Sequence, residues 1–280
     1  MPILMPEPKN TLLGKETVYS DRYNPDLLQP IKRSLGRDAI GDHDFRGADI
    51  WRLYELSWLN DQGIPQTAVG ELYVPADSHS IIESKSLKLY AGSFAMTRMQ
   101  DIEEVKRHFS EDLSDRLGAT VEVKLQPLSQ YHETLRTMPG ICLDALQLPT
   151  DAPVCAYETD PSYLRFVPHS DKIVEETFYT TVFRSLCPVT GQPDLASVMI
   201  SYRGNEIDPS GLLQYLISYR CHKGFHEQCV EQIYHDLRLA FNHQSLEVYA
   251  CFTRRGGIDI NPFRSSWRDR PEEPIRENRQ

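Results

Sequence analysis

Residues 57–66 read SWLNDQGIPQ, and residues 185–194, 128 positions further along, read SLCPVTGQPD. Each copy lies between two runs that are rich in apolar and aromatic residues. Glycine and proline mark turns because glycine reaches positive φ and proline fixes φ at about −65°. Three turn positions agree between the copies: Ser57 with Ser185, Gly63 with Gly191, and Pro65 with Pro193. A turn repeated at one offset predicts a diverged tandem repeat, and this decides the fold of the chain.

The first half reads, outward from its turn, as strand, strand, helix, helix, strand. Residues 49–59 and 68–74 have the aromatic content and the alternation that are typical of strands. Ser84 is the expected N-cap of the first helix, Gly118 is the expected end of the second, and residues 120–125 form the last strand. Apolar positions recur at helical spacing on one face of each helix: Leu87, Tyr90, Ala91 and Phe94, then Ile102, Val105, Phe109, Leu113 and Leu117.

The second half repeats this order. Strands are predicted at 174–186, 195–202 and 246–253, and a helix is predicted over about 209–219. A second helix has its apolar face formed by Phe225, Cys229, Val230, Ile233 and Leu237. The patterns divide the chain into an irregular N-terminal arm (1–45), a first repeat (46–138), a proline-rich linker (139–165), a second repeat (166–264) and a polar tail (265–280).

Alignment of the halves at the offset of 128 shows where their chemistry differs. The segment ESK at 83–85 has no counterpart, since GLL at 211–213 stands in its place. The other positions that differ are Cys187 with Leu59, Asp194 with Gln66, His226 with Arg98, and Glu227 with Met99. Each half therefore holds polar groups that the other lacks, which predicts a single site at the junction of the halves.

Cys187 has three interpretations at this point: a buried structural thiol, a metal ligand, or a nucleophile. An isolated cysteine is most often a small buried apolar residue. Pro188 and Gly191 place Cys187 at the end of a strand, however, where a side chain becomes accessible. Asp194 follows across the turn, which can bring its carboxyl group back towards the sulfur as a proton donor.

The segment CHKGFHEQC at 221–229 has the composition of a zinc site. His222 and His226 are spaced by one helical turn, but Gly224 interrupts the helix between them and Cys229 lies on its apolar face. We therefore predict no metal site. Glu227 is either a solvated glutamate that favours the helix dipole or a carboxylate in a cleft, where it can accept two parallel N–H bonds from a guanine or pterin edge.

Two basic segments are candidates for binding an anion. In ESKSLKLY at 83–90, two lysines in the first turns of a helix oppose its dipole, which is unfavourable unless an anion binds there. RRGG at 254–257 follows the last predicted strand and is either a hairpin turn with solvated arginines or a second phosphate clamp. The chain contains neither GxGxxG after a strand nor GxxxxGK[ST], so neither motif would hold a nucleotide here.

Composition excludes several classes of function. The formal net charge is −10, which disfavours a stable complex with nucleic acid. No apolar run reaches the roughly 18 residues that span a bilayer. The N-terminal sequence MPILMPEPKN does not resemble a secretory signal, so we expect a cytoplasmic protein whose six cysteines stay reduced.

Four segments together resemble a known family. They are IESKSLKLY at 82–90, SLCPVTGQPD at 185–194, FHE at 225–227 and RRGGIDINPFR at 254–264. They resemble the NADPH-dependent 7-cyano-7-deazaguanine reductases, the nitrile reductases of queuosine biosynthesis, in their long two-repeat form. The resemblance covers nearly all of the chain after the arm, and ESKSLK is its most specific part.

The resemblance implies an α+β fold of tandem tunneling-fold repeats, each an antiparallel sheet with two helices in the order strand, strand, helix, helix, strand, strand. This fold is shared with GTP cyclohydrolase I, but the reductases need no catalytic zinc. Reduction of the nitrile to a primary amine uses two NADPH as diffusible co-substrate. A homodimer is expected because open sheet edges need covering.

The resemblance also implies roles for single residues. Cys187 attacks the nitrile carbon to form a covalent thioimide, and Asp194 donates the proton. The expected substrate contacts are Ile82, Glu83, Ser84, His226 and Glu227. The expected NADPH contacts are Ser84, Lys85, Arg255 and Gly256.

Two rival functions belong to other classes. A cysteine hydrolase of nitriles or amides would use Cys187, His226 and a carboxylate with water and no nicotinamide. A non-catalytic purine- or pterin-binding module would bind the base without forming an adduct. The fold alone does not choose among the three.

Overall fold

The computed structural model describes residues 19–41, 43–146, 148, 157–241 and 243–280. The first half consists of β2 (Arg46–Leu59), β3 (Pro65–Pro75), β4 (Ser80–Ile82), α2 (Ser84–Ser93), α3 (Ile102–Leu117) and β5 (Glu122–Pro127). The second half consists of β7 (Ile173–Leu186), β8 (Pro193–Asn205), α4 (Pro209–Ser218), α5 (His226–Phe241), β9 (Ser245–Phe252) and β10 (Ile258–Ser265). The order predicted from the sequence for each half is confirmed, with the short β4 added before α2.

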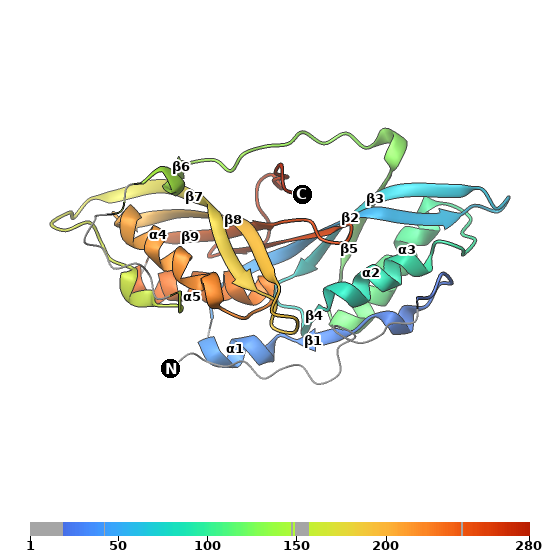
Figure 1. The fold of residues 1–280 in the computed structure, drawn as a ribbon, viewed down its shortest axis with the longest axis horizontal. Coiled ribbons are helices and arrows are strands. Elements are labelled where there is room, and N and C mark those ends of the chain that lie inside the picture. Colours follow the sequence, from blue (N-terminus) through green and yellow to red (C-terminus); the bar gives the residue numbers. More distant parts are fainter. Residues whose placement is uncertain (1–18, 42, 147, 149–156, 242) are drawn as a thin grey trace.

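The fold is α+β. Except for β4, which pairs with β1 (Pro30–Lys32) in a separate two-stranded sheet, these strands belong to an eight-stranded sheet with the helices on one face (Figure 1). Its order is β5-β3-β2-β10-β9-β8-β7-β6, where β6 is Ile141–Cys142. All neighbours are antiparallel except β6 and β7. A fourth strand was implied for each half, but in residues 128–140, all of them described, none follows β5. The fourth strand of the second half, β10, lies between β9 and β2 of the first half, and this pairing joins the halves into one sheet.

The offset of 128 is wrong at the turn itself. Leu59 and Leu186 each donate a backbone N–H to the segment before the second helix of their half, at N···O distances of 2.9 and 2.8 Å. These two leucines are therefore equivalent, and the turn of the second half is one residue longer. Cys187 consequently falls on Asn60, and its placement on Leu59 is corrected.

The helices are displaced further, by one helical turn. α3 begins at Ile102 and α5 begins at His226, an offset of 124 residues, and both are 16 residues long. Four residues are about one turn of helix, so the offset of 128 had matched the correct faces in the wrong turn. His226 falls on Ile102, and Glu227 falls on Glu103, not on Arg98 and Met99. The buried positions then agree: Val105 with Cys229, Phe109 with Ile233, Leu113 with Leu237, and Leu117 with Phe241.

An acidic residue begins the first helix of both halves. Glu83 is the N-cap of α2, because its carboxylate accepts the backbone N–H groups of Lys85 at 2.8 Å and Ser86 at 2.7 Å. Asp208 caps α4 in the same way. The N-cap role expected for Ser84 is therefore wrong by one residue. Segment 83–85 therefore does have a counterpart, DPS at 208–210, and the lysine of ESK has no equivalent there. Gly118 ends α3 in the left-handed conformation, as predicted (φ 67).

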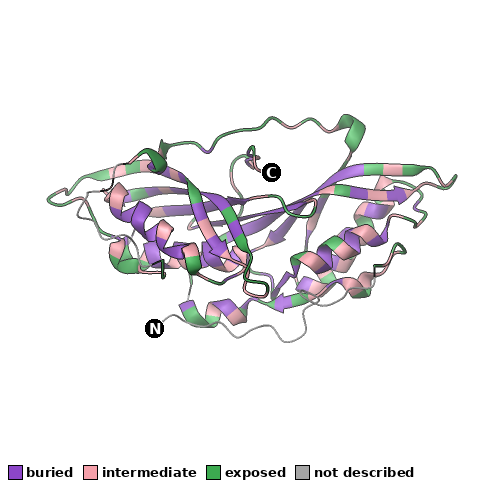
Figure 2. Cartoon of the chain, in the orientation of Figure 1, coloured by how far each residue is buried: buried purple, intermediate pink, exposed green. Residues whose placement is uncertain are grey.

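Each half has its own apolar core between the sheet and its helices (Figure 2). A third cluster lies on the helix-free face of the sheet and takes residues from both halves and the tail. Ile275 belongs to it and is only 7% exposed. The tail at 265–280, expected to be polar, therefore packs against the sheet in part, as Figure 1 shows for the C-terminal end.

The arm and the linker contain more structure than expected. Residues 19–45 include β1 (Pro30–Lys32), which pairs with β4, and α1 (Ser34–Ile40), so the expected irregular arm is wrong for this part. The linker contributes β6, which pairs in parallel with β7. Residues 1–18 of the arm and 147 and 149–156 of the linker lie outside the described residues. The described helices are too short or too polar to cross a bilayer.

A buried ion network ties the arm to the junction of the halves. Arg33 forms an ion pair with Asp49 at 2.5 Å, and Arg264 contacts Asp49 at 2.8 Å and Glu231 at 2.6 Å. Burial opposes the ionisation of Glu231, but Arg264 and the arginines of the arm hold its pKa at about 2. The network fixes α1, β2, α5 and β10 against one another, and these elements surround the candidate site.

Candidate functional site

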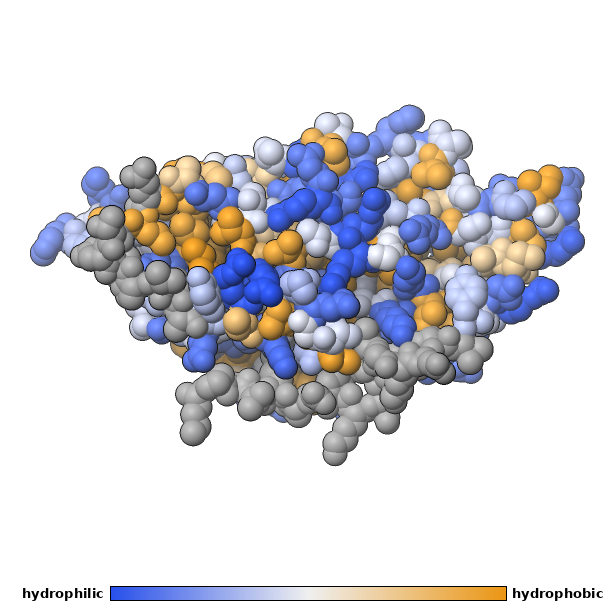
Figure 3. Space-filling model, in the orientation of Figure 1, coloured by the Kyte–Doolittle hydropathy of each residue, from blue (hydrophilic) through white to orange (hydrophobic). Residues whose placement is uncertain are grey.

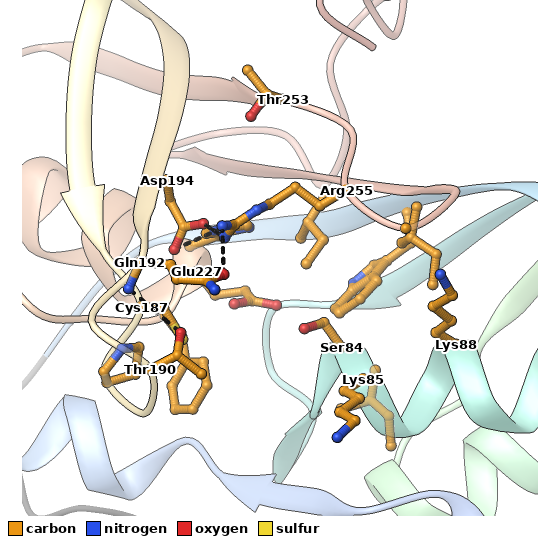
Figure 4. Close-up of a pocket in the computed structure, with 18 of the residues that line it drawn as sticks. Ser84, Lys85, Lys88, Cys187, Thr190, Gln192, Asp194, Glu227, Thr253 and Arg255 are labelled. Carbon is orange, nitrogen blue, oxygen red and sulfur yellow. Dashed lines mark hydrogen bonds and ion pairs between the residues drawn. The ribbon is translucent and has the colours of Figure 1, made fainter. Parts of the chain in front are cut away.

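A cavity of about 240 Å³ lies where the two halves meet (Figure 4). The first half contributes Trp51, Ile82, Ser84, Lys85 and Lys88. The second half contributes Cys187, Asp194, His226, Glu227, Arg255 and Gly256 among others. Every residue singled out from the sequence lies on its wall except Glu83. The junction predicted from the two halves therefore contains a real cavity.

Glu83 lies behind the wall. Its side chain is fully buried and both carboxylate oxygens are engaged in capping α2. Burial raises the pKa of Glu83, while the two backbone N–H groups oppose that rise. In this structure Glu83 holds Ser84 and Lys85 at the cavity and does not itself face it.

Cys187 is the first residue after β7, at the strand end that the sequence predicted. Its backbone N–H donates to Gln192 O at 2.8 Å, and its carbonyl accepts from Gly191 N at 2.9 Å. Gly191 has φ 67, which favours glycine at this position. The closed turn presents the half-buried thiol to the cavity from the same hairpin that carries Asp194 (Figure 4).

Asp194 is buried and has two partners. Its Oδ1 forms an ion pair with Arg255, and its Oδ2 lies 3.5 Å from His226 Nε2. Arg255 also donates to Gln192 Oε1 at 3.0 Å, so it contacts both Gln192 and Asp194, on either side of the first residue of β8. The His226 ring stacks flat on Phe252, with centroids 3.8 Å apart and planes at 7°. The acid is therefore held in place by a cation and an oriented ring.

Glu227 lies in the cavity wall with only 2% of its surface exposed. Its Oε1 has no hydrogen-bond partner among the described residues. Burial, with the nearby charge of Asp49, raises the pKa of Glu227 to about 8, although Arg33 and Arg264 oppose the shift. An unpaired buried carboxyl group is costly unless a ligand satisfies it. Glu227 is thus suited to bind an N–H edge of a ligand.

One side of the cavity is cationic, although the chain as a whole is acidic. Lys85 and Lys88 reach it from α2, and Arg255 reaches it from the turn after β9 (Figure 4). At Gly256 φ is 59, and a Cβ there would lie 2.7 Å from Lys88 Nζ, so glycine permits this close approach. Hydrophilic residues run down the middle of the face that Figure 3 shows. Cations near a helix start, with a glycine backbone in a neighbouring turn, suit phosphate groups.

The cysteine and histidine cluster at 221–229 is not arranged around a cation. Burial raises the pKa of the Cys229 thiol to about 12. Burial lowers the pKa of His222. Over the described residues, no group of three His, Cys, Asp or Glu side chains could hold a metal ion.

Sequence reasoning missed the aromatic part of the site. Trp51 lines the cavity from the middle of β2, and Phe252 supports His226 from the end of β9. Both sit in apolar strands, where a buried aromatic residue is the ordinary expectation. Lys88 was part of a quoted motif but was not singled out. Gln192, which binds Arg255, carried no signal beyond its place in the turn.

Comparison with known proteins identifies relatives of this chain. Residues 19–125 match the family described as nitrile reductase, 7-cyano-7-deazaguanine-reductase N-term, and residues 193–271 match QueF-like protein. A NADPH-dependent 7-cyano-7-deazaguanine reductase of Burkholderia thailandensis is 48% identical over 264 residues, covering 93% of this chain and 94% of that protein. The protein of the same name from Burkholderia lata is 47% identical over 277 residues, covering 98% and 99%.

A solved structure, the archaeosine synthase QueF-Like in the apo form, aligns with a TM-score of 0.30 and 18% identity over 35% of this chain and 95% of that one. A TM-score this low gives no information about the fold of this chain. The full-length relatives are sufficient to assign the family, because they align across both halves and the site between them. The chain therefore belongs to the family of NADPH-dependent 7-cyano-7-deazaguanine reductases.

Proposed function

We propose that this chain reduces the nitrile of 7-cyano-7-deazaguanine to a primary amine with NADPH, in queuosine biosynthesis. One observation carries the proposal. A thiol and a held acid, Cys187 and Asp194, share a cavity with an unpaired carboxyl group, Glu227, and with the cations of α2. The family relatives, which bear this activity in their names, support it over the full chain.

The substrate base would lie against Glu227 and His226. The Glu227 carboxylate accepts two parallel N–H bonds from the guanine-like edge, which supplies the partners that Oε1 lacks. His226 is held by its stack on Phe252, so its ring is fixed before the base arrives. Ile82 supplies an apolar wall and Ser84 a hydroxyl group. Glu83 lies behind these residues and caps α2, which fixes the start of that helix.

Cys187 would then add to the nitrile. Its thiol proton passes to Asp194, the sulfur bonds to the nitrile carbon, and the π electron pair moves to the nitrogen. Asp194 gives the same proton to that nitrogen, which leaves a neutral covalent thioimide and restores the carboxylate. The ion pair with Arg255 keeps Asp194 in place while the proton moves. A nitrile is a poor hydride acceptor, and the C=N bond formed here is a better one.

The cationic side fits NADPH. Lys85, Lys88 and Arg255 supply positive charge for its phosphates, and Gly256 offers backbone without a side chain. Two NADPH, bound one after the other, would each supply one hydride to the nitrile carbon. After the first hydride Cys187 would leave as the thiolate and give an imine, which the second hydride would reduce to the amine. Two protons from solvent would complete the balance, one on the sulfur and one on the amine nitrogen.

For the architecture, we propose tandem tunneling-fold repeats at 46–138 and 166–264. The common order of elements and the two separate cores support this division. A homodimer fits a sheet whose outer strands, β5 and the two-residue β6, end it at open edges. A cytoplasmic location and a lack of nucleic-acid binding stay predictions, the latter supported by the net charge of −10.

The test is intact-protein mass spectrometry with 7-cyano-7-deazaguanine, followed by absorbance at 340 nm after NADPH is added. We expect an adduct of one substrate mass at Cys187 without NADPH, and two NADPH oxidised per product with it. A cysteine hydrolase would instead release ammonia with no change at 340 nm. A binding module would give neither an adduct nor turnover. Either result would overturn the proposed function.

The structure favours the reductase over the hydrolase in one respect. A hydrolase needs a histidine directed at the thiol and oriented by a carboxylate. Here His226 Nε2 faces Asp194 at 3.5 Å and its ring is stacked on Phe252. Asp194 is in turn held by Arg255, and His226 Nε2 is directed at this acid, which supports Asp194 as the group that transfers the proton.

Binding of the base should depend on pH through Glu227. Its pKa is raised to about 8, so below pH 8 it is protonated in the ligand-free enzyme and must lose a proton to accept two N–H bonds. We expect the Kd of the base to fall about tenfold per pH unit from pH 6 to pH 8 and to level above it. Calorimetry on Cys187→Ala avoids the adduct. Glu227→Gln should bind weakly with no such slope, and an unchanged slope in that variant would contradict the assignment.

A further inference from the structure

The two strands that precede and follow the Arg255 turn separate as they approach the cavity. β9 and β10 pair with each other only at Tyr249 with Phe263, Val248 with Arg264, and Glu247 with Ser265. Beyond these pairs β9 stays with β8 of the second half and β10 stays with β2 of the first half. The strands therefore form a fork that opens towards residues 253–257. This turn carries Arg255 and Gly256 on the cavity wall.

The end of the tail fills this fork. Ile275 N–H donates to the Tyr249 hydroxyl at 3.3 Å, and its carbonyl accepts from Arg52 Nη1 at 3.1 Å. The carbonyl of Arg279 accepts the backbone N–H of Arg254 at 3.0 Å. The contacts are well covered, since Ile275, Glu277 and Gln280 are each under 9% exposed. Figure 1 shows this end of the chain against the helix-free face of the sheet, opposite the helices.

Gln280 contacts both arms of the fork with one side chain. Its Nε2 donates to the carbonyl of Phe252, the last residue of β9, at 3.0 Å. The same nitrogen donates to Asn261 Oδ1 on β10 at 2.5 Å. Its own backbone is fixed by a bond from Gln280 N to Glu277 O at 3.1 Å. The two arms share no ladder bond at this level, so the amide group sets their separation.

We propose that the tail segment 275–280 positions the Arg255 turn for cofactor binding, with Gln280 as its positioning residue. The fork is open, the tail bonds to both of its arms, and the tail holds Arg254, the neighbour of Arg255. Displacement of β9 would therefore carry Arg255 away from Lys85 and Lys88 on the same side of the cavity. Phe252, which supports His226, is held by the same amide group. The cofactor part of this proposal rests on the proposed function.

The simpler role for the tail is to cover apolar surface. Ile275 serves that role, because it belongs to the apolar cluster on this face. Gln280 does not, since its side chain makes directed bonds to two polar groups. Substitution of Gln280 thus separates positioning from coverage, and Asn278, an exposed neighbour in the same segment, is the matched control.

The first measurement needs no substrate. Hydrogen exchange of the full chain should report the turn at 253–258, where Arg254 N–H is bonded to the tail. We expect Gln280→Ala to speed exchange there about tenfold, because two bonds to buried acceptors are lost. Asn278→Ala should leave it unchanged. Equal exchange in the two variants would overturn the positioning role, whatever reaction the enzyme catalyses.

The second measurement concerns the cofactor. Gln280→Ala should raise the KM for NADPH about tenfold and slow covalent adduct formation at Cys187 by a smaller factor, because the turn also holds Asp194 through Arg255. Gln280→Glu keeps the shape but removes the N–H donors, so it should behave like alanine or worse. Normal KM in Gln280→Glu would refute the hydrogen-bond argument. Adduct formation in the wild type without NADPH oxidation would instead refute the proposed function.

Discussion

Cys187→Ala is expected to form no covalent adduct with 7-cyano-7-deazaguanine and to lose turnover by about 10⁴-fold or more. The variant removes the only nucleophile that the hairpin turn presents to the cavity within the described residues, and the unactivated nitrile accepts hydride poorly. The backbone bonds that close the turn do not need the thiol, so the fold should persist. The measurements are intact mass and NADPH oxidation at 340 nm.

Cys221→Ala is the matched control. Cys221 is exposed, lies five positions before α5 begins at His226, and does not line the cavity. This variant should keep the adduct and its turnover. Cys187→Ala that still oxidises NADPH at more than a few per cent of the wild-type rate would refute covalent catalysis by this residue. An adduct that moves to another cysteine would refute it as well.

Asp194→Ala is expected to lower kcat by about 10²–10⁴-fold with a smaller effect on the KM of the base. Asp194 carries the proton from the thiol to the nitrile nitrogen, and no other residue of the turn segment 185–194 has a carboxyl side chain. Glu227 holds the base in the variant as before. Single-turnover mass spectrometry should show slow adduct formation, and steady-state kinetics should show the split between kcat and KM.

The loss of Asp194 also frees Arg255, so a control must separate the two effects. Gln192→Ala removes the other side-chain partner of Arg255 and leaves the acid in place. We expect this variant to keep kcat within about threefold of the wild type. A drop of the size seen for Asp194→Ala would move the effect from proton transfer to the placement of Arg255. Equal losses in kcat and affinity in Asp194→Ala would also argue against a proton-transfer role.

The sequence predicted the order of elements and the junction site because both follow from local patterns. The spacing of apolar residues and the identity of turn residues indicate a strand, a helix or a hairpin at any place in the chain. They do not count residues between repeats, so the helices of the second half were matched one turn out of register. Residues about four positions apart lie on the same face of a helix, so an alignment shifted by four residues still matches apolar positions with apolar positions. The match of Val105 to Cys229 is visible only once both helices have known first residues.

Contacts between distant segments were beyond sequence reasoning. No sequence pattern around Arg33 predicts that it binds Asp49 and lies beside Glu231, which is 198 positions away. Phe252 and Trp51 look like core residues until the cavity beside them is known. Glu83 was predicted as a ligand contact because it belongs to a motif, yet its carboxylate is engaged by α2. A motif locates a site, but it does not say which of its members face the ligand.

The pairing of β10 with β2 has a consequence for synthesis on the ribosome. β2 leaves the ribosome early. The backbone N–H and C=O groups on the edge that pairs with β10 have no partner until residues 258–265 have also left the exit tunnel. At about 5–20 residues added per second, that edge waits for tens of seconds. An exposed strand edge of this length is open to wrong pairing with other nascent chains. The joint between the halves therefore forms late in synthesis, and the edge of β2 needs protection while the chain is being made.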